Sequence, residues 1–198
     1  MQRDVLWAPW EAPGLEHLRL EMSAETISAN GAIIAVFDGG VFRASYHITC
    51  DGAWRMRQVQ ILASHPAAIA LDLYTDGAGH WSNPSGEPLP ALDGCIDVDI
   101  AATPFTNTLP IRRLGLQPGE PAEIAVVYID APSLEMTPVR QRYTCLARDA
   151  DSARYRFEAL PYQALPDGFV AELSVDTDGL VRDYPPLFRR IWSEEAPV

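Results

Sequence analysis

The sequence has 198 residues and an ordinary hydrophobic content of 47%, but it carries a formal net charge of −12. An acidic chain without a basic face or tail argues against binding to nucleic acid or to an anionic membrane surface. No stretch approaches the roughly 18 apolar residues that span a membrane, so we expect no transmembrane segment. The N-terminal residues do not resemble a secretory signal, and we therefore expect a cytoplasmic protein.

The length and the cysteines bound the architecture. A chain of this size buries enough surface for one hydrophobic core, so we expect a single domain over residues 1–198. The three cysteines, Cys50, Cys95 and Cys145, are odd in number and far apart. This spacing is not that of a disulfide framework.

Pairs of Asp and Gly punctuate the chain and predict tight hairpin turns, because Gly readily adopts the positive φ that such turns need. These pairs begin at Asp38, Asp51, Asp76, Asp93, Asp167 and Asp178, and Asn30–Gly31 adds a seventh. Between them apolar and polar residues alternate with a period of two, as in residues 41–50. The pattern predicts an antiparallel meander in an all-β or nearly all-β protein.

Nine segments carry this alternation and are expected to be strands. They are residues 18–22, 26–37, 41–50, 54–62, 69–75, 123–130, 139–146, 154–160 and 168–175. Helical signals are few: Pro104 and Pro110 each fall early in a potential helical turn, and Gly115 is suited to cap a helix that ends at Leu114. Residues 185–192 form a second candidate helix.

No metal, cofactor or catalytic residue is expected. His47 and Cys50 lie three residues apart on a predicted strand and so face opposite sides, and the chain has no Cys-x-x-Cys. The segment that begins at Asp176 opens like a calcium loop but lacks the later Glu ligand, so we interpret it as a turn. The nucleophile elbow, the phosphate-binding loop and the dinucleotide fingerprint are also absent from the sequence.

The segment 92–116 carries the most chemistry. Two carboxylates on its strand are expected to share one face about 7 Å apart, and two arginines on another strand are expected to face the same way. Threonine, asparagine and arginine side chains follow in the irregular part of the segment. The candidate ligand-binding residues are Asp97, Asp99, Thr106, Asn107, Arg112, Arg113, Arg140 and Arg142.

Three interpretations of this set remain open. Arg–Asp pairs that fix the irregular segment to the sheet would make it structural. Alternatively, the arginines, Asn107 and the threonines would present hydrogen-bond donors to a sugar or phosphate headgroup. A catalytic role for Asp97 or Asp99 as acid or base predicts that one carboxylate is desolvated and stands at a pocket.

Five stretches resemble a bacterial family labelled glycolipid-binding, formerly a domain of unknown function. They are GLEHLRL (14–20), LDGCIDVDIAATPFTNTLPIRRLGL (92–116), AEIAVVYID (122–130), MTPVRQRYT (136–144) and VDTDGLVRDYPPLFRR (175–190). The resemblance implies a spiral β-roll, a long antiparallel sheet wrapped around a single helix, similar to the half-barrels of lipoprotein-localisation factors. About ten N-terminal and about seven C-terminal residues lie beyond it and are expected to be loosely attached.

The resemblance favours a non-catalytic binding or carrier protein for a glycolipid or another amphiphile. The acyl chain would lie inside the wrap and the headgroup near the arginines. Two alternatives come from other classes of protein. One is an enzyme that acts on a small molecule with Asp97 or Asp99, and the other is a homodimeric interaction module that uses an exposed sheet edge.

Overall fold

The computed structural model describes residues 1–37, 40–64, 67–162 and 165–194, which form one sheet of 14 strands. The strands of the first half are β1 (Gln2–Pro9), β2 (Gly14–Met22), β3 (Thr26–Phe37), β4 (Gly40–Asp51), β5 (Met56–Ser64), β6 (Ala68–Thr75) and β7 (Trp81–Ser82). Those of the second half are β8 (Asp97–Ile100), β9 (Pro121–Ile129), β10 (Met136–Arg148), β11 (Ser152–Ala159), β12 (Phe169–Asp176), β13 (Val181–Tyr184) and β14 (Phe188–Ser193).

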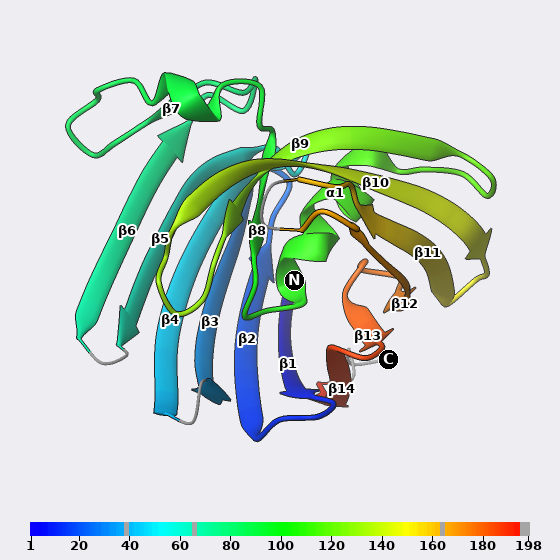
Figure 1. Ribbon diagram of the computed structural model, residues 1–198. Coiled ribbons are helices and arrows are strands. Elements are labelled where there is room, and N and C mark those ends of the chain that lie inside the picture. Colours follow the sequence, from blue (N-terminus) through cyan, green and yellow to red (C-terminus); the bar gives the residue numbers. More distant parts are fainter. Residues whose placement is uncertain (38–39, 65–66, 163–164, 195–198) are drawn as a thin grey trace.

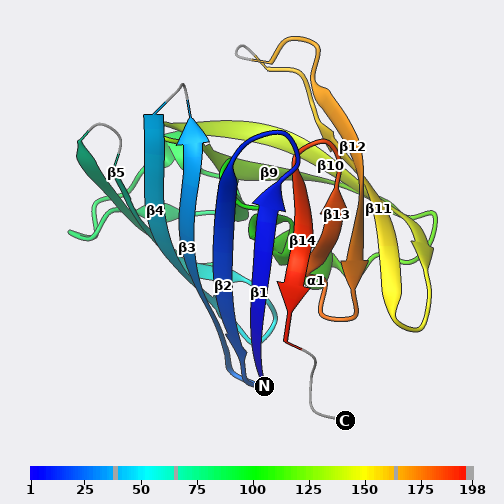
Figure 2. The ribbon, with the colours of Figure 1, turned by 90° about the horizontal axis from the view of Figure 1, so that it is seen from below.

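The sheet is an open meander in which β7 and β8 are the two edge strands. Its strand order is β7-β6-β5-β4-β3-β2-β1-β14-β13-β12-β11-β10-β9-β8, and among the described pairs only β8 and β9 are parallel. The first strand pairs with the last, which joins the two halves (Figure 2). Figure 1 shows the sheet curling around the short helix α1 (Thr108–Leu114). The protein is therefore mainly β, with a rolled sheet wrapped around a helix, as predicted.

The helix forms where the sequence predicts it. It follows the 3₁₀ turn η2 (Phe105–Asn107), and Pro110 falls in its first turn, where a missing N–H leaves no hydrogen bond unmade. Gly115 ends it in the left-handed conformation, with φ 58° and its N–H 3.3 Å from the carbonyl oxygen of Ile111. The second predicted helix, residues 185–192, is wrong because β14 occupies most of that segment and pairs with β1.

The core is divided between the two halves of the roll. One cluster packs on the first half and another on the second half. The β8 end of the sheet is tucked between them: Val98 and Ile100 belong to the first cluster, whereas Val126 of the neighbouring β9 belongs to the second. This inward turn of the sheet edge makes the roll a spiral. A further 3₁₀ turn, η1 (Pro90–Leu92), lies between β7 and β8.

The N-terminal segment is a central strand, so the prediction of a loose N-terminus is wrong. Val5 and Trp7 on β1 are completely buried, and the indole nitrogen of Trp7 donates to the carbonyl oxygen of Val181 at 2.8 Å. At the other end Trp192 and Ser193 pair with β1, so the prediction also fails for these two residues. Residues 195–198 lie outside the described part of the chain.

The predicted turns hold in some places and fail in others. Asp178–Gly179 joins β12 to β13 with φ 77° at the glycine. Asn30–Gly31 instead lies inside β3, so the prediction of a turn there is wrong. Gly31 is required for packing, because a Cβ at this position would lie 2.0 Å from the ring of Tyr46. The predicted turn at Asp38 falls outside the described residues.

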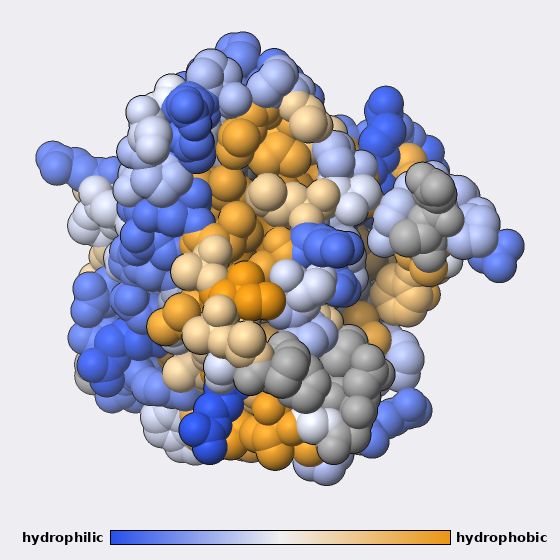
Figure 3. Space-filling model, turned by 60° about the vertical axis from the view of Figure 1, so that its left-hand side comes forward, coloured by the Kyte–Doolittle hydropathy of each residue, from blue (hydrophilic) through white to orange (hydrophobic). Residues whose placement is uncertain are grey.

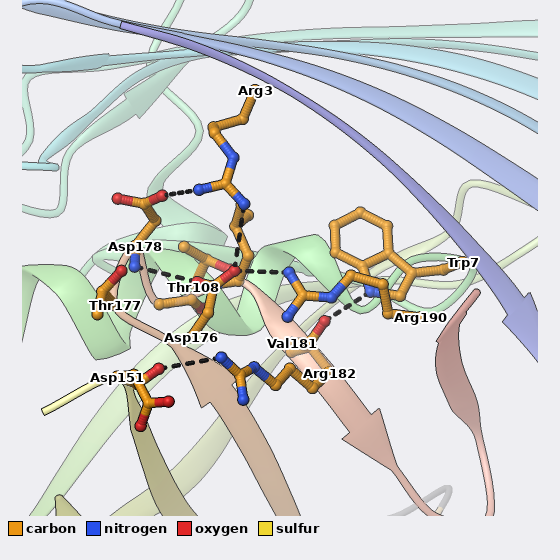
Figure 4. Close-up of polar contacts among 12 residues, drawn as sticks. Arg3, Trp7, Thr108, Asp151, Asp176, Thr177, Asp178, Val181, Arg182 and Arg190 are labelled. Carbon is orange, nitrogen blue, oxygen red and sulfur yellow. Dashed lines mark hydrogen bonds and ion pairs between the residues drawn. The ribbon is translucent and has the colours of Figure 1, made fainter. Parts of the chain in front are cut away.

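Polar contacts fasten α1 and β1 to the turn between β12 and β13 (Figure 4). The hydroxyl of Thr108 donates to a backbone carbonyl of this turn at 2.9 Å. The carboxylate of Asp176 accepts from Arg190 at 2.5 Å and lies 3.7 Å from Arg3, which donates to Asp178 at 2.6 Å. The turn interpretation is therefore confirmed: a backbone carbonyl of the turn holds α1, and its carboxylates hold β1 and β14.

Candidate functional site

Two cavities adjoin inside the roll. We call the first the apolar cavity; it has a volume of about 340 Å³ and lies at one end of β1 to β4. We call the second the polar cavity; it has a volume of about 630 Å³ and lies on the inner face of the second half. Ala101, Leu187 and Phe188 line both, so the cavities share a wall. Their volumes fall in the range of small-molecule sites.

The apolar cavity is walled by Trp7 of β1, Ile33 of β3 and Phe42 of β4. Leu15 and Val36 also line it and are more than a third exposed, so the apolar lining continues to the surface. Figure 3 shows hydrophobic residues gathered in a band on one face, with hydrophilic residues on both sides. The exposed part of the cavity lining, Leu15 and Val36, gives an apolar molecule a route into the apolar cavity.

One buried acid stands in this apolar wall. Glu16 is 3% exposed, and its Oε1 accepts from the hydroxyls of Tyr46 at 2.5 Å and Thr103 at 2.6 Å. Among the described residues its Oε2 has no hydrogen-bond partner. Burial raises the pKa of Glu16 to about 7, although both hydroxyls act in the opposite direction. Thr103 lines the polar cavity, so Glu16 lies where the two cavities meet.

Gly31 brings Tyr46 to this acid. It pairs with Tyr46 across β3 and β4, and without a side chain it lets the tyrosine ring lie over β3 toward Glu16 on β2. Phe105 of η2 stacks on the ring, with centroids 6.2 Å apart. Sequence reasoning missed Glu16. The period of two in GLEHLRL places Glu16 on the same face as Leu18 and Leu20, which is the core face.

The polar cavity is centred on a second acid. Asp99 of β8 accepts from the side-chain amide of Gln141 at 2.6 Å and from the hydroxyl of Thr106 at 3.3 Å. Burial raises its pKa, and these two hydrogen bonds oppose the shift only in part. Asp130 and Glu135 also line this cavity, and the described residues that line the two cavities include no arginine.

Aromatic rings form much of the rest of the polar cavity. They are Tyr128, Phe157, Tyr162, Phe169, Tyr184 and Phe188. Several touch one another: the ring centroids of Phe157 and Tyr184 are 6.0 Å apart, and those of Tyr128 and Tyr162 are 6.5 Å apart. Burial, with the charges of Asp99 and Asp130, raises the pKa of Tyr128 to about 12, so its hydroxyl stays neutral. Aromatic walls with a few fixed polar groups are typical of small-molecule sites.

The structure brings three of the eight predicted ligand-binding residues to this region and joins two others, Asp97 and Arg113, in an ion pair. Asp99 and Asn107 line the polar cavity, and Thr106 bonds to Asp99. Asp97 is fully buried and accepts from the Nη2 of Arg113 at 2.5 Å and from its Nε at 3.3 Å. Burial raises the pKa of Asp97 despite this arginine. The pair ties α1 to β8, as the structural interpretation predicts.

The other three predicted residues lie away from both cavities. Arg140 and Arg142 pair with Glu123 at the protein surface. Arg112 lies 5.4 Å from the ring of Trp54. Because alternate residues of a strand face opposite sides, Gln141, which lies between the two arginines on β10, faces the polar cavity, as Val139 does. The arginines and Asp99 therefore do not form one polar surface, in contrast to the prediction.

Metal-binding groups, cysteines and long apolar helices were compared with the predictions over the described part of the chain. No group of three or more His, Cys, Asp or Glu side chains is placed there to hold a metal ion. The cysteines predicted to be unpaired, Cys50, Cys95 and Cys145, are free thiols and buried. Within the same ranges, no helix has the length and apolar character to cross a membrane.

Comparisons with known proteins place the chain in a family. A family model described as "Putative glycolipid-binding" matches residues 4–190. A crystal structure of a DUF1089 family protein from Pseudomonas aeruginosa is 38% identical with a TM-score of 0.77, over 93% of this chain and 95% of that one. A beta-barrel-like protein of domain of unknown function DUF1849 from Brucella abortus is 11% identical with a TM-score of 0.53, over 98% and 95%, and shows similarity of fold alone. None of the curated proteins matches. Because the family model covers nearly the whole sequence, the chain belongs to this glycolipid-binding family, as its resemblance indicated.

Proposed function

We propose that the protein binds an uncharged amphiphile, with the apolar chain in the apolar cavity and a hydroxyl-rich headgroup in the polar cavity. The observation that carries this proposal is the shared wall between the apolar cavity and a second cavity that presents three carboxylates beside its aromatic rings. A molecule with an apolar and a polar end matches such a pair, whereas a small polar substrate leaves the first cavity empty. The family description supports the same class of ligand.

The apolar cavity suits a hydrocarbon chain. Trp7, Ile33 and Phe42 are buried side chains of the sheet, so the wall is formed by the fold itself. Each methylene group transferred from water to such a wall contributes about 0.8 kcal/mol to binding. The exposed Leu15 and Val36 extend this surface outward, which gives the chain a path of entry.

The polar cavity suits a neutral headgroup. Asp99, Asp130 and Glu135 line it without an arginine, so a phosphate would meet carboxylates and no compensating positive charge. Sugar hydroxyls can instead donate to Asp99, whose position Gln141 and Thr106 fix. We therefore infer a glycosyl headgroup rather than a phosphate.

Calorimetric titration with dodecyl glucoside and dodecyl phosphate, both below their micellar concentrations, tests this proposal. The glucoside is expected to bind, and the phosphate at least about tenfold more weakly, a difference of about 1.4 kcal/mol. Equal or tighter binding of the phosphate would overturn the assignment of the headgroup. If neither the glucoside nor the phosphate binds, the amphiphile proposal itself is overturned.

Two variants localise the ligand. Ala102→Trp places an indole in the apolar cavity and is expected to abolish binding of dodecyl glucoside. Arg140→Ala removes an exposed arginine remote from both cavities and is the matched control, expected to bind as the wild type does. Native mass spectrometry of freshly purified protein, followed by solvent extraction, would identify a ligand that the protein already carries.

A second candidate function is favoured by Asp99. Its burial, raised pKa and position at a cavity are the features predicted for an acid–base residue. If the protein is such an enzyme, dodecyl glucoside or another glycoside incubated with it will be cleaved, and Asp99→Asn will abolish the cleavage. Recovery of intact ligand from the wild-type protein argues for binding alone.

A further inference from the structure

One carboxylate oxygen in the roll lacks a partner. Glu16 is buried, and its Oε1 accepts two hydroxyl groups, from Tyr46 and Thr103, whereas its Oε2 accepts none from the described residues. Buried polar atoms without partners are rare and costly in folded proteins. Because Glu16 lines the apolar cavity, a ligand that enters there lies next to this carboxylate and can complete its hydrogen bonding.

The location of Glu16 restricts which part of a ligand can reach it. Its side chain lines the apolar cavity, and Thr103, bonded to it at 2.6 Å, lines the polar cavity. The acid is therefore at the junction, where the chain of a bound amphiphile would meet its headgroup. Glu11 is the other ionisable residue in the lining of the apolar cavity, and it is exposed.

The chemistry of an acid in this setting selects the ligand group. Tyr46 from β4 and Glu11 from the loop after β1 are the titratable neighbours, and the walls from β1 and β3 are apolar. Because burial raises the pKa of Glu16 to about 7, both its ionised and its neutral form are populated near neutrality. An ammonium group matches only the ionised form, and a carboxylate matches only the neutral form. A hydroxyl can donate to the first and accept from the second.

We propose that Glu16 recognises a hydroxyl group on the ligand's chain, next to the point where the chain joins the headgroup. This inference rests on the proposed function and defines its ligand class more narrowly, as amphiphiles with a hydroxylated chain. A site built to pair with a hydroxyl discriminates strongly against the analogue that lacks it, because the protein group then stays unpaired. Glu16 is thus a specificity-determining residue for the apolar part of the ligand.

Titration of the wild-type protein with three probes tests the inference. The probes are dodecyl glucoside, β-hydroxydodecyl glucoside and β-aminododecyl glucoside, each measured at about pH 6 and about pH 8 on either side of the glutamate's titration. The hydroxylated probe is expected to bind on the order of tenfold more tightly than the plain one at both pH values. Equal affinities, or tightest binding of the amine at the higher pH, would overturn the hydroxyl assignment. Absence of binding by all three would overturn the proposed function as well.

Variants of Glu16 connect the preference to this residue. Glu16→Leu is expected to bind the plain and the hydroxylated probe equally, and Tyr46 and Thr103, whose hydroxyls are 3.4 Å apart, can then pair with each other. Glu16→Gln places an amide NH₂ group where the carboxylate oxygen Oε2 was, and this group can donate to the ligand's hydroxyl oxygen. The variant is therefore expected to retain the preference for the hydroxylated probe. Glu21→Leu, an exposed glutamate on the same strand, is the matched control and keeps the wild-type preference. Retention of the preference in Glu16→Leu would overturn the proposal even if Glu16→Gln behaves as expected.

Discussion

Two buried acids of the roll are built in opposite ways. Asp97 is completely buried and accepts two hydrogen bonds from one guanidinium, that of Arg113. Glu16 is equally buried but has only hydroxyl partners, both on one oxygen. Both oxygens of Asp97 therefore have a partner within the protein, and its charge is balanced by Arg113. Glu16 is held in place with bonding capacity left over, which is the arrangement expected of a binding residue.

Asp99 lies between these extremes. It accepts from an amide and a hydroxyl of the protein, has no arginine partner in the described part of the chain, and lines a cavity. Asp97 lies two residues before Asp99 on the same strand, and it is bonded to Arg113 of α1. One short strand therefore supplies one acid to the structure and one to the candidate site. Burial alone does not separate these roles, but the partner does.

The largest effect is expected where the acid depends on its partner. Arg113→Ala leaves Asp97 buried without a counter-charge and should lower the free energy of unfolding by about 3–5 kcal/mol. The loss should be smaller in acid, because the unpaired carboxyl can then take up a proton. Urea denaturation at several pH values measures both effects. A loss no larger than that of Arg140→Ala, which removes an exposed arginine, would show that the Asp97 pair is not the tie we describe.

Glu16, which has only hydroxyl partners among the described residues, should make the free energy of unfolding depend on pH. The pKa of Glu16 is about 7, against an ordinary value of 4.5, so its neutral form is favoured in the folded state. Because the pKa is higher in the folded state than in the unfolded state, protonated Glu16 stabilises the fold. This contribution, about 3 kcal/mol, is fully present below about pH 4.5 and is lost as the pH rises through 7. The difference in unfolding free energy between wild type and Glu16→Gln, measured from acid to alkaline pH, isolates this contribution. A difference that is flat across this range would contradict it.

The same contrast shows what the sequence can reveal. The period of two, the proline positions and Gly115 predict the sheet and the helix, because these signals act locally through backbone geometry. The partners do not follow from such signals: Arg113 meets Asp97 because α1 lies inside the roll, and Glu16 meets Thr103 across 87 positions of sequence. Charge alone predicts the arginines of β10 as site residues, but their alternation with the buried Gln141 places them on the other face.

A smaller effect is expected from the glycine that lets Tyr46 reach Glu16. Gly31→Ala places a methyl group in the space of the tyrosine ring and should cost about 1–3 kcal/mol, as other overpacking substitutions do. Thermal or urea unfolding measures the loss, with Ala32→Ser, an exposed change on the same strand, as the control. In a Tyr46→Leu background the added methyl group should cost little, because the ring is gone. If the cost is unchanged in that background, the ring is not the obstacle.

The smallest effect is expected on β10, where two neighbouring residues lie on opposite faces of the strand. Arg142 is half-exposed on the outer face, and its partner Glu123 also pairs with Arg140, so Arg142→Ala should change neither stability nor affinity for dodecyl glucoside measurably. Gln141→Leu instead removes the amide that holds Asp99 and should weaken glucoside binding. Titration of both variants with the same probe compares the two faces of one strand. If Arg142→Ala weakened binding and Gln141→Leu did not, the headgroup would lie among the arginines, and the polar cavity would lose its assignment.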